Sequence, residues 1–388
     1  MAGTVQLDRY KLFYDGVCNA VANVDIIANT TILFEDLGYD GPFKKSQIWH
    51  DKAPLSIGTR GDDHYFGDFV NWVLLALVRA EAMNITQETA YQFPKTQVFG
   101  KEYENMFIDA LSAVGNYAEL YERNYGKLLP RHPMNQLNHG DTGMMFSYPL
   151  GDTKIPFDLD EELIPKPTPN GTLEAIYNLG RLRCGIVVGD DHSLPKGFAM
   201  LNTTSVSEEW FGFHVELCRG LDAALFSRNS GSLEIVPFDT YEEAFVGLSQ
   251  DTVDVIAGAP FNLANDVKEP TTSVGFAFGP IHFYGDGIQL AVATREDDVQ
   301  FNDFIRWMVF ATINAEEEGI TSGNAFEMPV IDLFGSQYQQ AFRDIIGTIG
   351  NYGEIYNRTL QAYLPRSGRN RLNTQNTAEL FPFWEFNA

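Results

Sequence analysis

The stretch VGNYAELYERNYGKLLPR, Val114 to Arg131, returns later in the chain as IGNYGEIYNRTLQAYLPR, Ile349 to Arg366. Sliding the chain against itself by this 235-residue offset extends the match in both directions without a gap, for example from Asp68 to Asp303. A gapless match of this length indicates a duplication. Two long copies predict two similar domains, whereas solenoids stack many short repeats.

The duplication divides the 388 residues into two copies and a linker. Copy A covers residues 1–150 and copy B covers residues 173–388. The segment 151–172 between them is rich in proline and acidic residues, which is typical of a linker. Copy B begins with GRLRCGIVVGDD and WFGFHVELCRGLDAALF, which copy A lacks. Copy A is therefore expected to be truncated at its front.

Several residues recur at equivalent positions in the two copies and are expected to occupy equivalent core positions. Both tryptophans of this set lie on the apolar side of equivalent predicted helices, and core packing explains them better than a functional role. The set is Trp72, Trp307, Gly115, Asn116, Tyr117, Gly350, Asn351 and Tyr352.

Copy B alternates short β-branched runs with helical patterns. The runs at 181–188, 233–238, 253–259 and 288–294 predict strands, and the patterns at 213–226, 241–250, 299–319 and 337–357 predict helices. Strands that alternate with helices indicate βαβ units and a parallel sheet. The predicted fold class is α/β, with two pseudo-symmetric three-layer domains.

Composition excludes several classes of function. A net charge of −25 argues against nucleic-acid binding, which needs clustered lysine and arginine. No run approaches the roughly 20 apolar residues of a membrane span. The sequence lacks GxGxxG, GxxxxGK[ST] and HExxH, so we assign no catalytic, cofactor-binding or metal-binding residue and expect no enzyme.

The three cysteines are Cys18, Cys184 and Cys218. They are too few for a disulfide framework and have no metal-binding spacing, so buried free thiols are the default expectation. A bond between Cys184 and Cys218 is the alternative, because a strand and the helix after it pack together.

Several motifs along the chain occur in an order that is typical of one protein family. GRLRCGI, FGFHVELCRGLDAALF, VDVIA, FNDFIRWMVFATINAEEEGITSGN and IGNYGEIYNR resemble, in this order, the solute-binding proteins of polar amino-acid ABC transporters, most closely the general L-amino-acid branch. The resemblance covers most of copy B and the later two thirds of copy A. It implies that each copy has the fold of one lobe of a type II periplasmic binding protein.

The sequence departs from this family at two places. Phe283 to Asp298 runs from the family's YDGQG-like turn directly into the return strand, so the second lobe is missing. The family also holds the ligand carboxylate with an arginine after the VDV strand, but Ala257 to Val267 has none. At the equivalent place copy A carries Glu35 and Asp36, which would repel a carboxylate. These losses predict that no amino acid binds in the family's usual way.

A fold that keeps its core and loses its ligand site predicts a structural protein. The main hypothesis is therefore a non-catalytic protein that self-assembles into a lattice, filament or shell, such as a pyrenoid-type shell, with itself as partner and no nucleic acid. The alternative is a ligand-binding or transport-linked module with a pocket between the two copies. An organelle interior such as plastid stroma, reached after removal of a leader, is the compartment considered.

The C-terminal stretch ELFPFWEF is the candidate assembly tail. Its apolar residues are expected to dock onto copy A of a neighbouring molecule, because an aromatic terminus is normally held against other structure. The alternative is that the tail packs on its own copy B. The residues concerned are Leu380, Phe381, Phe383, Trp384 and Phe386.

Overall fold

The structure is a computed structural model. It describes residues 11–20, 38–39, 41, 56–126, 131, 171–188, 196–202, 209–227, 232–267, 275–285, 288–367 and 370.

Copy B contains a five-stranded sheet and a two-stranded sheet. Its strands are β1 (Leu182–Val187), β4 (Leu233–Phe238), β5 (Val255–Pro260), β6 (Phe276–Gly285) and β7 (Ile288–Arg295), and a separate hairpin joins β2 (Met200–Asn202) to β3 (Glu209–Phe211). The five-stranded sheet has the order β4-β1-β5-β7-β6. β4, β1 and β5 are parallel, whereas β7 is antiparallel to both β5 and β6. The sheet is therefore mixed rather than parallel throughout, and the α/β class is confirmed.

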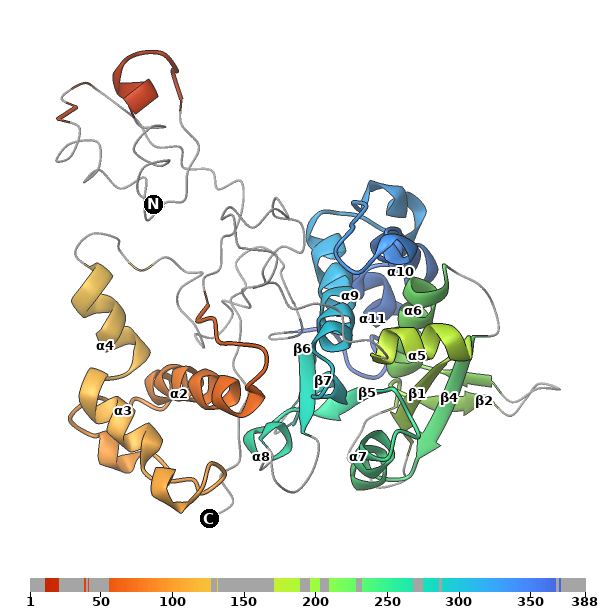
Figure 1. Cartoon of the computed structure of the whole chain (residues 1–388), viewed down its shortest axis with the longest axis horizontal. Coiled ribbons are helices and arrows are strands. Elements are labelled where there is room, and N and C mark those ends of the chain that lie inside the picture. The colour runs from red at the N-terminus through yellow and green to blue at the C-terminus, as the bar shows by residue number, and fades with distance from the viewer. Residues whose placement is uncertain are drawn as a thin grey trace.

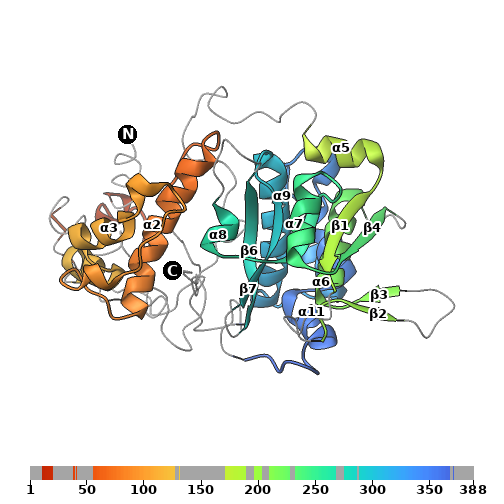
Figure 2. The same ribbon diagram turned by 90° about the horizontal axis from the view of Figure 1, so that it is seen from below.

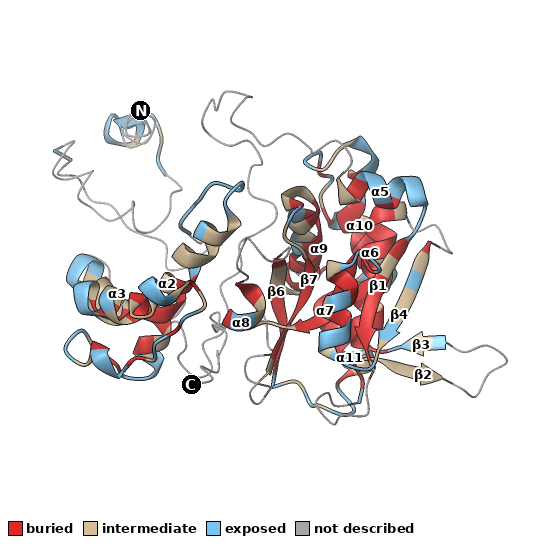
Figure 3. Ribbon diagram, turned by 60° about the horizontal axis from the view of Figure 1, so that its bottom comes forward, coloured by how far each residue is buried: buried red, intermediate tan, exposed pale blue. Residues whose placement is uncertain are grey.

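Helices cover both faces of this sheet (Figures 1 and 2). They are α5 (Thr172–Leu179), α6 (Phe213–Phe226), α7 (Tyr241–Ser249), α8 (Leu263–Asp266), α9 (Val299–Glu317), α10 (Ala341–Ile349) and α11 (Tyr352–Thr359). α7 packs on one face through Ala244 and Leu248. α6 and α9 pack on the other face, with α10 and α11 beyond them. In Figure 3 the buried residues, in red, lie mainly on the strands and on the helices that cover them.

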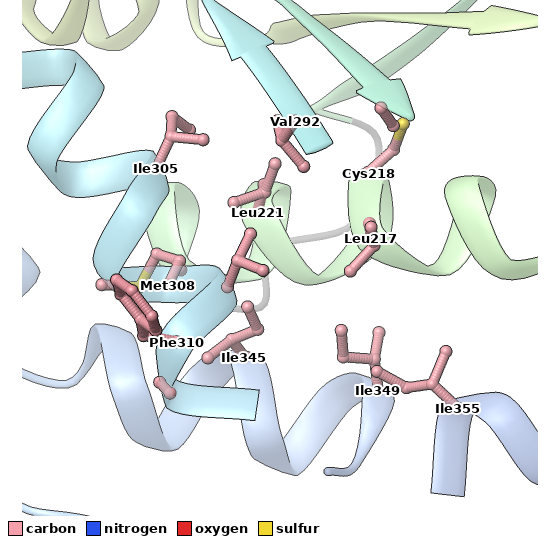
Figure 4. Close-up of a cluster of buried hydrophobic side chains, with 14 of the residues drawn as sticks. Leu217, Cys218, Leu221, Val292, Ile305, Met308, Phe310, Ile345, Ile349 and Ile355 are labelled. Carbon is pink, nitrogen blue, oxygen red and sulfur yellow. The ribbon is translucent and has the colours of Figure 1, made fainter. Parts of the chain in front are cut away.

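The main core of copy B lies between the sheet and the second layer of helices. Figure 4 shows Leu217 and Leu221 of α6 directed toward Ile345 and Ile349 of α10, with Val292 of β7 above them. All five side chains are almost completely buried. Close packing of branched side chains on both sides of α6 fixes this helix between the sheet and α10.

The helix predicted over 337–357 is two helices. α10 ends at Gly350, whose φ of 75° no β-carbon-bearing residue adopts easily, and Asn351 then caps α11. Asn351 and Glu354 form a capping box, in which each side chain accepts from the other residue's backbone N–H. The chain therefore turns between α10 and α11, where the apolar spacing of the sequence predicted one continuous helix.

Cys184 of β1 and Cys218 of α6 form a disulfide, with 5.9 Å between their Cα atoms. The default expectation of free thiols is wrong for this pair, because the strand and the helix that follows it meet at these two residues. Cys18 is a free, half-buried thiol.

The described part of copy A consists of helices: α2 (His64–Ala82), α3 (Met106–Val114) and α4 (Tyr117–Tyr121), with short helical turns between and after them. The segment VDIIA, Val24 to Ala28, which is similar to the VDVIA segment of copy B, lies outside the described residues. Copy A has its own apolar cluster, which includes Trp72 and Phe107 and extends into copy B at Leu263 and Val267. In the part of the chain that the structure describes, no helix has the length and apolar character needed to cross a bilayer.

Candidate functional site

The segment that follows β5 is the place where the resembled family anchors its ligand. Here it forms the short helix α8, and Phe261, Leu263 and Val267 pack into the apolar cluster of copy A. The Trp72 indole Nε1 of α2 donates a hydrogen bond to Asp266 Oδ2 at 2.7 Å. Both residues are buried. The segment therefore attaches copy A to copy B. Figure 2 shows α8 between α2 and the sheet. Glu35 and Asp36 of copy A lie outside the described residues.

A cavity of about 370 Å³ lies where copy A meets the edge of the copy B sheet. We call it the junction cavity. Its walls come from the entry to α2, from β6 and the end of β7, and from the first half of α9. The lining residues used below are Thr59, His64, Asp68, Thr294, Asp303 and Arg306.

The junction cavity is lined by the same segment of each copy. Thr59 and Thr294 are equivalent under the 235-residue offset, and so are Asp68 and Asp303. The helices that carry the two aspartates, α2 and α9, are each 19 residues long. Each begins at an aspartate whose side chain accepts the backbone N–H three residues on. The cavity therefore combines two equivalent helix starts.

Carboxyl groups crowd the copy A side of this junction. Burial raises the pKa of Asp68 to about 9, with further contributions from the nearby charges of Asp266 and Glu296. Burial likewise raises the pKa of Asp266 to about 7, although the Trp72 hydrogen bond opposes this shift. The pKa of Glu296 rises to about 7 through burial and the neighbouring Asp266 and Asp297. Among the described residues no lysine or arginine forms an ion pair with these acids, so their protonated forms are favoured.

The cavity is also lined by three basic residues, His64, Arg60 and Arg306. His64 Nδ1 lies 3.8 Å from Glu296 Oε1, but burial lowers the pKa of His64 and favours the neutral ring. Arg60 is bound by the neighbouring Asp62. Arg306 is exposed, its guanidinium lies 5.6 Å from the centre of the Phe310 ring, and it forms no ion pair within the described residues. Arg306 therefore presents a guanidinium that is available to an anionic group.

Asp303 lies one helical turn before Arg306 on α9. Burial raises the pKa of Asp303, whereas the nearby charge of Arg306 lowers it. The cavity lining thus includes the carboxylate of Asp303 and the guanidinium of Arg306, three residues apart on α9, and the carboxyl group of Asp68 on α2. A small molecule that carries charges of both signs would find complementary groups here.

Gly115 and Gly350 have matching roles. They end α3 and α10 with φ values of 77° and 75°. The asparagines that follow them cap the next helices and reach back to a preceding backbone carbonyl: Asn116 Nδ2 donates to Ile85 O at 2.8 Å, and Asn351 Nδ2 donates to Ile320 O at 2.7 Å. The repeated sequence thus encodes the same helix–turn–helix joint twice.

Tyr117 and Tyr352 lie under equivalent arginines. The Arg131 guanidinium is 5.0 Å from the Tyr117 ring centre, and the Arg366 guanidinium is 4.8 Å from that of Tyr352. The tyrosines differ in burial. Tyr352 is fully buried and its hydroxyl donates to His282 O at 2.6 Å, whereas Tyr117 is half-buried.

Trp72 and Trp307 also differ. Trp72 is completely buried and joins the copies, whereas Trp307 is half-buried and packs against Phe310 with 5.3 Å between ring centres. The difference arises because α8 covers α2 at Trp72. The candidate assembly tail, residues 379–388, lies outside the described residues.

Sequence reasoning named a pocket between the two copies as its alternative, but it did not identify Asp266 or Arg306. Arg306 lies inside a motif that was recognised for its family resemblance, and the repeat places Asn71 at the equivalent position of copy A. A charged residue that replaces a neutral one between duplicated segments is a signal that could have singled it out. Asp266 had no such signal, because its partner Trp72 lies 194 residues away.

Comparisons with known proteins connect the chain to amino-acid-binding proteins. No family model matches it. The General L-amino acid-binding periplasmic protein AapJ of Rhizobium johnstonii is 36% identical over 88 residues, covering 18% of this chain and 26% of that protein. The Putative amino-acid ABC transporter-binding protein YhdW of Escherichia coli K12 is 31% identical over 120 residues, covering 26% of this chain and 34% of that protein. The chain thus spans no more than about a third of these relatives.

Solved structures with similarity to the chain carry related titles. A periplasmic binding protein of an ABC transporter from Brucella ovis, with glutathione bound, is 19% identical, has a TM-score of 0.43, and is matched over 98% of its length and 55% of this chain. The arginine-bound form of domain 1 from TmArgBP is 23% identical, has a TM-score of 0.26, and is matched over 94% of its length and 34% of this chain.

The resemblance to solute-binding proteins is confirmed by these relatives, which are binding proteins rather than enzymes. The hypothesis of a structural protein that self-assembles into a shell is wrong, because the relatives are named for ligand binding and transport. The expectation of itself as sole partner, with no amino-acid ligand, falls with it. The absence of the family's arginine accompanies the packing of the segment after β5 against copy A. It does not show that the chain has lost every ligand site.

Proposed function

We propose that this chain is a non-catalytic solute-binding protein, linked to transport, whose ligand occupies the junction cavity. The observation that carries the proposal is the cavity itself: about 370 Å³, lined by equivalent segments of both copies, and including Arg306, which forms no ion pair with the described residues. Two similar domains with a ligand between them would reproduce, with different parts, the clamp of a two-lobed binding protein.

The size and chemistry of the cavity support a small polar ligand. Sites for small molecules have volumes of roughly 300–1,000 Å³. A guanidinium matches the two oxygens of a carboxylate, and Arg306 can therefore anchor an acid group. The relatives named as amino-acid-binding proteins extend this to an amino acid as the class of solute.

The contacts of the segment after β5, where the resembled family binds its ligand, support the same proposal. Phe261, Leu263 and Asp266 contact copy A, so the segment after β5 fastens the two copies together. A rigid junction favours binding because its walls need little ordering when the ligand arrives. According to this proposal, the ligand binds in the junction cavity and not beside the segment after β5.

The compartment that we propose is the periplasm or another oxidising space. One relative is named as a periplasmic protein. The disulfide between Cys184 and Cys218 fits such a space, since disulfides persist mainly outside the reducing cytosol. The plastid stroma considered from the sequence has no comparable support.

The test is isothermal titration calorimetry of the full chain with a panel of L-amino acids. Binding of at least one amino acid at micromolar affinity is expected, with at least a tenfold loss in Arg306→Ala. Arg181→Ala is the matched control, because Arg181 is an exposed arginine that pairs with Glu234 and does not line the cavity. Failure of every amino acid to bind, or equal affinity of Arg306→Ala and the intact chain, would overturn the proposal.

A further inference from the structure

Two fully buried histidines meet in the core of copy B. His214 is the second residue of α6, and His282 lies in β6. Both have an exposed fraction of 0%, and their ring centres are 5.6 Å apart. Within the part of the chain that the structure describes, none of their four ring nitrogens has a hydrogen-bond partner. Buried polar groups are normally hydrogen-bonded, so this pair requires an explanation.

Aromatic rings and backbone surround the two histidines. The Phe198 ring centre lies 4.7 Å from that of His214, and the Phe213 ring stacks on His282 with 5.6 Å between centres. β5 approaches His214 at Gly258, where a β-carbon would lie 2.0 Å from the imidazole. An imidazolium in this place would have neither water nor an acceptor beside it among the described residues.

The titratable and charged groups on the elements around the pair give no counter-charge to either ring. β5 has no such group, and the Glu216 carboxylate of α6 is already bound by Arg219 and Arg358. Among the described residues these groups are Lys196, Glu216, Arg219, Tyr284, Tyr352, Tyr356 and Arg358.

Both histidines are therefore neutral near pH 7. Burial lowers the pKa of His282 to about 3, and burial together with the neighbouring His282 lowers the pKa of His214. Burial raises the pKa of Tyr352 and of Tyr356, so these tyrosines are neutral as well. In acid, the two histidines are the groups of this cluster that can take up a proton.

His214 lies where the start of α6 is attached to the β2–β3 hairpin. The backbone N–H groups of Phe213 and His214 donate to the carbonyls of Gly197 and Phe198, at 2.8 and 2.9 Å. The hairpin forms a sheet of its own, is partly exposed, and projects beyond the five-stranded sheet in Figure 2. Segments with few buried contacts open at a lower free energy than the core. A displaced His214 would therefore release the start of α6 and the hairpin first.

We propose that the His214–His282 pair is an acid-sensitive latch. It holds the start of α6 and the β2–β3 hairpin against the sheet while both rings are neutral, and it releases them when the rings take up protons. A charged ring cannot stay in an apolar site without a hydrogen-bond partner, and two charged rings 5.6 Å apart would also repel each other. This inference does not depend on the proposed ligand site.

The direction of the effect follows from the neutral rings of the closed state. A histidine that is exposed by opening has a pKa of about 6.5, which is higher than in the closed state, so opening is linked to proton uptake. The latch is therefore fully closed above pH 6.5 and weakens as pH falls below it. Between pH 6 and pH 5 the opening equilibrium constant should rise about 60-fold with two such histidines and about eightfold with one.

The test is hydrogen–deuterium exchange of the full chain at pH 6 and pH 5, read by mass spectrometry and corrected for the intrinsic pH dependence of exchange. Protection of a peptide that spans residues 209–217 should fall about 60-fold between the two pH values. At pH 5 it should also be at least tenfold lower than the protection of β1, which reports opening of the core.

Two histidine variants and one control assign the effect. His282→Phe keeps a ring against Phe213, and His214→Asn removes the other imidazole, so each should reduce the change in protection to about eightfold. Phe283→Leu is the control, because it loosens the packing of β6 against Phe198 without removing a titratable group, and the change should stay near 60-fold. Thermal unfolding at pH 7.5 establishes that each variant is folded, and if His214→Asn is not, His282→Phe decides.

Three results would overturn the latch. The first is a change of eightfold or less in the intact chain. The second is a change in His282→Phe that equals that of the intact chain. The third is equal protection of residues 209–217 and of β1 at pH 5, because the protein would then open as a whole and not at the start of α6.

Discussion

Replacement of Trp72 by phenylalanine tests whether the segment after β5 fastens copy A to copy B. The change removes the indole N–H that Asp266 Oδ2 accepts at 2.7 Å while it keeps an aromatic ring in the same fully buried position. Asp266 is itself buried, so its carboxyl group would lose this donor where water has little access.

The expected cost follows from two contributions. A buried hydrogen bond to a charged partner contributes about 1.5–3 kcal/mol. The smaller ring adds about 1 kcal/mol of lost packing. We therefore expect Trp72→Phe to lower the free energy of unfolding by about 3 kcal/mol at pH 8.

The pH dependence is a second signature of the same bond. The pKa of Asp266 is raised to about 7, so the group is largely ionised at pH 8 and largely protonated at pH 5. The indole N–H stabilises the ionised form, and its removal raises this pKa further. The cost of Trp72→Phe should therefore be larger at pH 8 than at pH 5.

The assay is urea denaturation followed by circular dichroism, with Trp307→Phe as the matched control. Trp307 is the equivalent residue of copy B, is half-buried and has no indole hydrogen bond to the described residues, so its replacement should cost less than about 1 kcal/mol. Equal costs for the two substitutions, or no difference between pH 5 and pH 8, would refute the reasoning.

Three further predictions concern stability. The raised pKa of Asp68 means that its contribution to stability is complete near pH 4 and is lost as pH rises toward 9, so Asp68→Asn should gain stability over the intact chain between pH 5 and pH 9, by on the order of 1 kcal/mol. Removal of the disulfide by Cys184→Ala with Cys218→Ala should cost about 3–4 kcal/mol in urea denaturation, because the bond closes a loop of 34 residues. Gly258→Ala should cost about 3 kcal/mol or more, because Gly258 has a φ of 90° and a β-carbon there would lie 2.0 Å from the His214 ring.

Each of these has a contrary outcome. A thermal midpoint of Asp68→Asn that follows the intact chain at every pH would mean that Asp68 is not destabilised by burial. Equal stability with and without the disulfide would place the two cysteines apart in the folded protein. A Gly258→Ala protein with an unchanged urea midpoint would contradict the packing of the His214 ring against β5.

The strands and helices predicted for copy B agree with the structure. The residues that form each apolar pattern are the ones that the packed sheet and helices bury. The strand at LEIVPF and the helix at FHVELCRGLDAALF have the predicted bounds within a residue or two. The exception is the single helix expected over 337–357. Gly350 interrupts it, because a glycine with positive φ followed by an asparagine cap is a local signal that outweighs the apolar spacing around it.

The junction cavity could not be predicted from the sequence in the same way. It depends on how copy A docks against β6 and α9, and the residues that decide this docking, Trp72 and Asp266, are far apart in the chain. The alignment of the copies did identify Asp68 and Asp303 as equivalent, but only the structure places them around one space. The sequence shows that the segment after β5 has no arginine. Only the structure shows that this segment forms α8 and packs against copy A.

The central claim is that ligand binds between the two copies. The most direct measurement is a crystal structure of the full chain grown with the amino acid that binds most tightly in calorimetry. The account predicts ligand density in the junction cavity, with the ligand carboxylate on Arg306. Ligand density at the carboxyl ends of β1, β4 and β5, with an empty junction cavity, would contradict it.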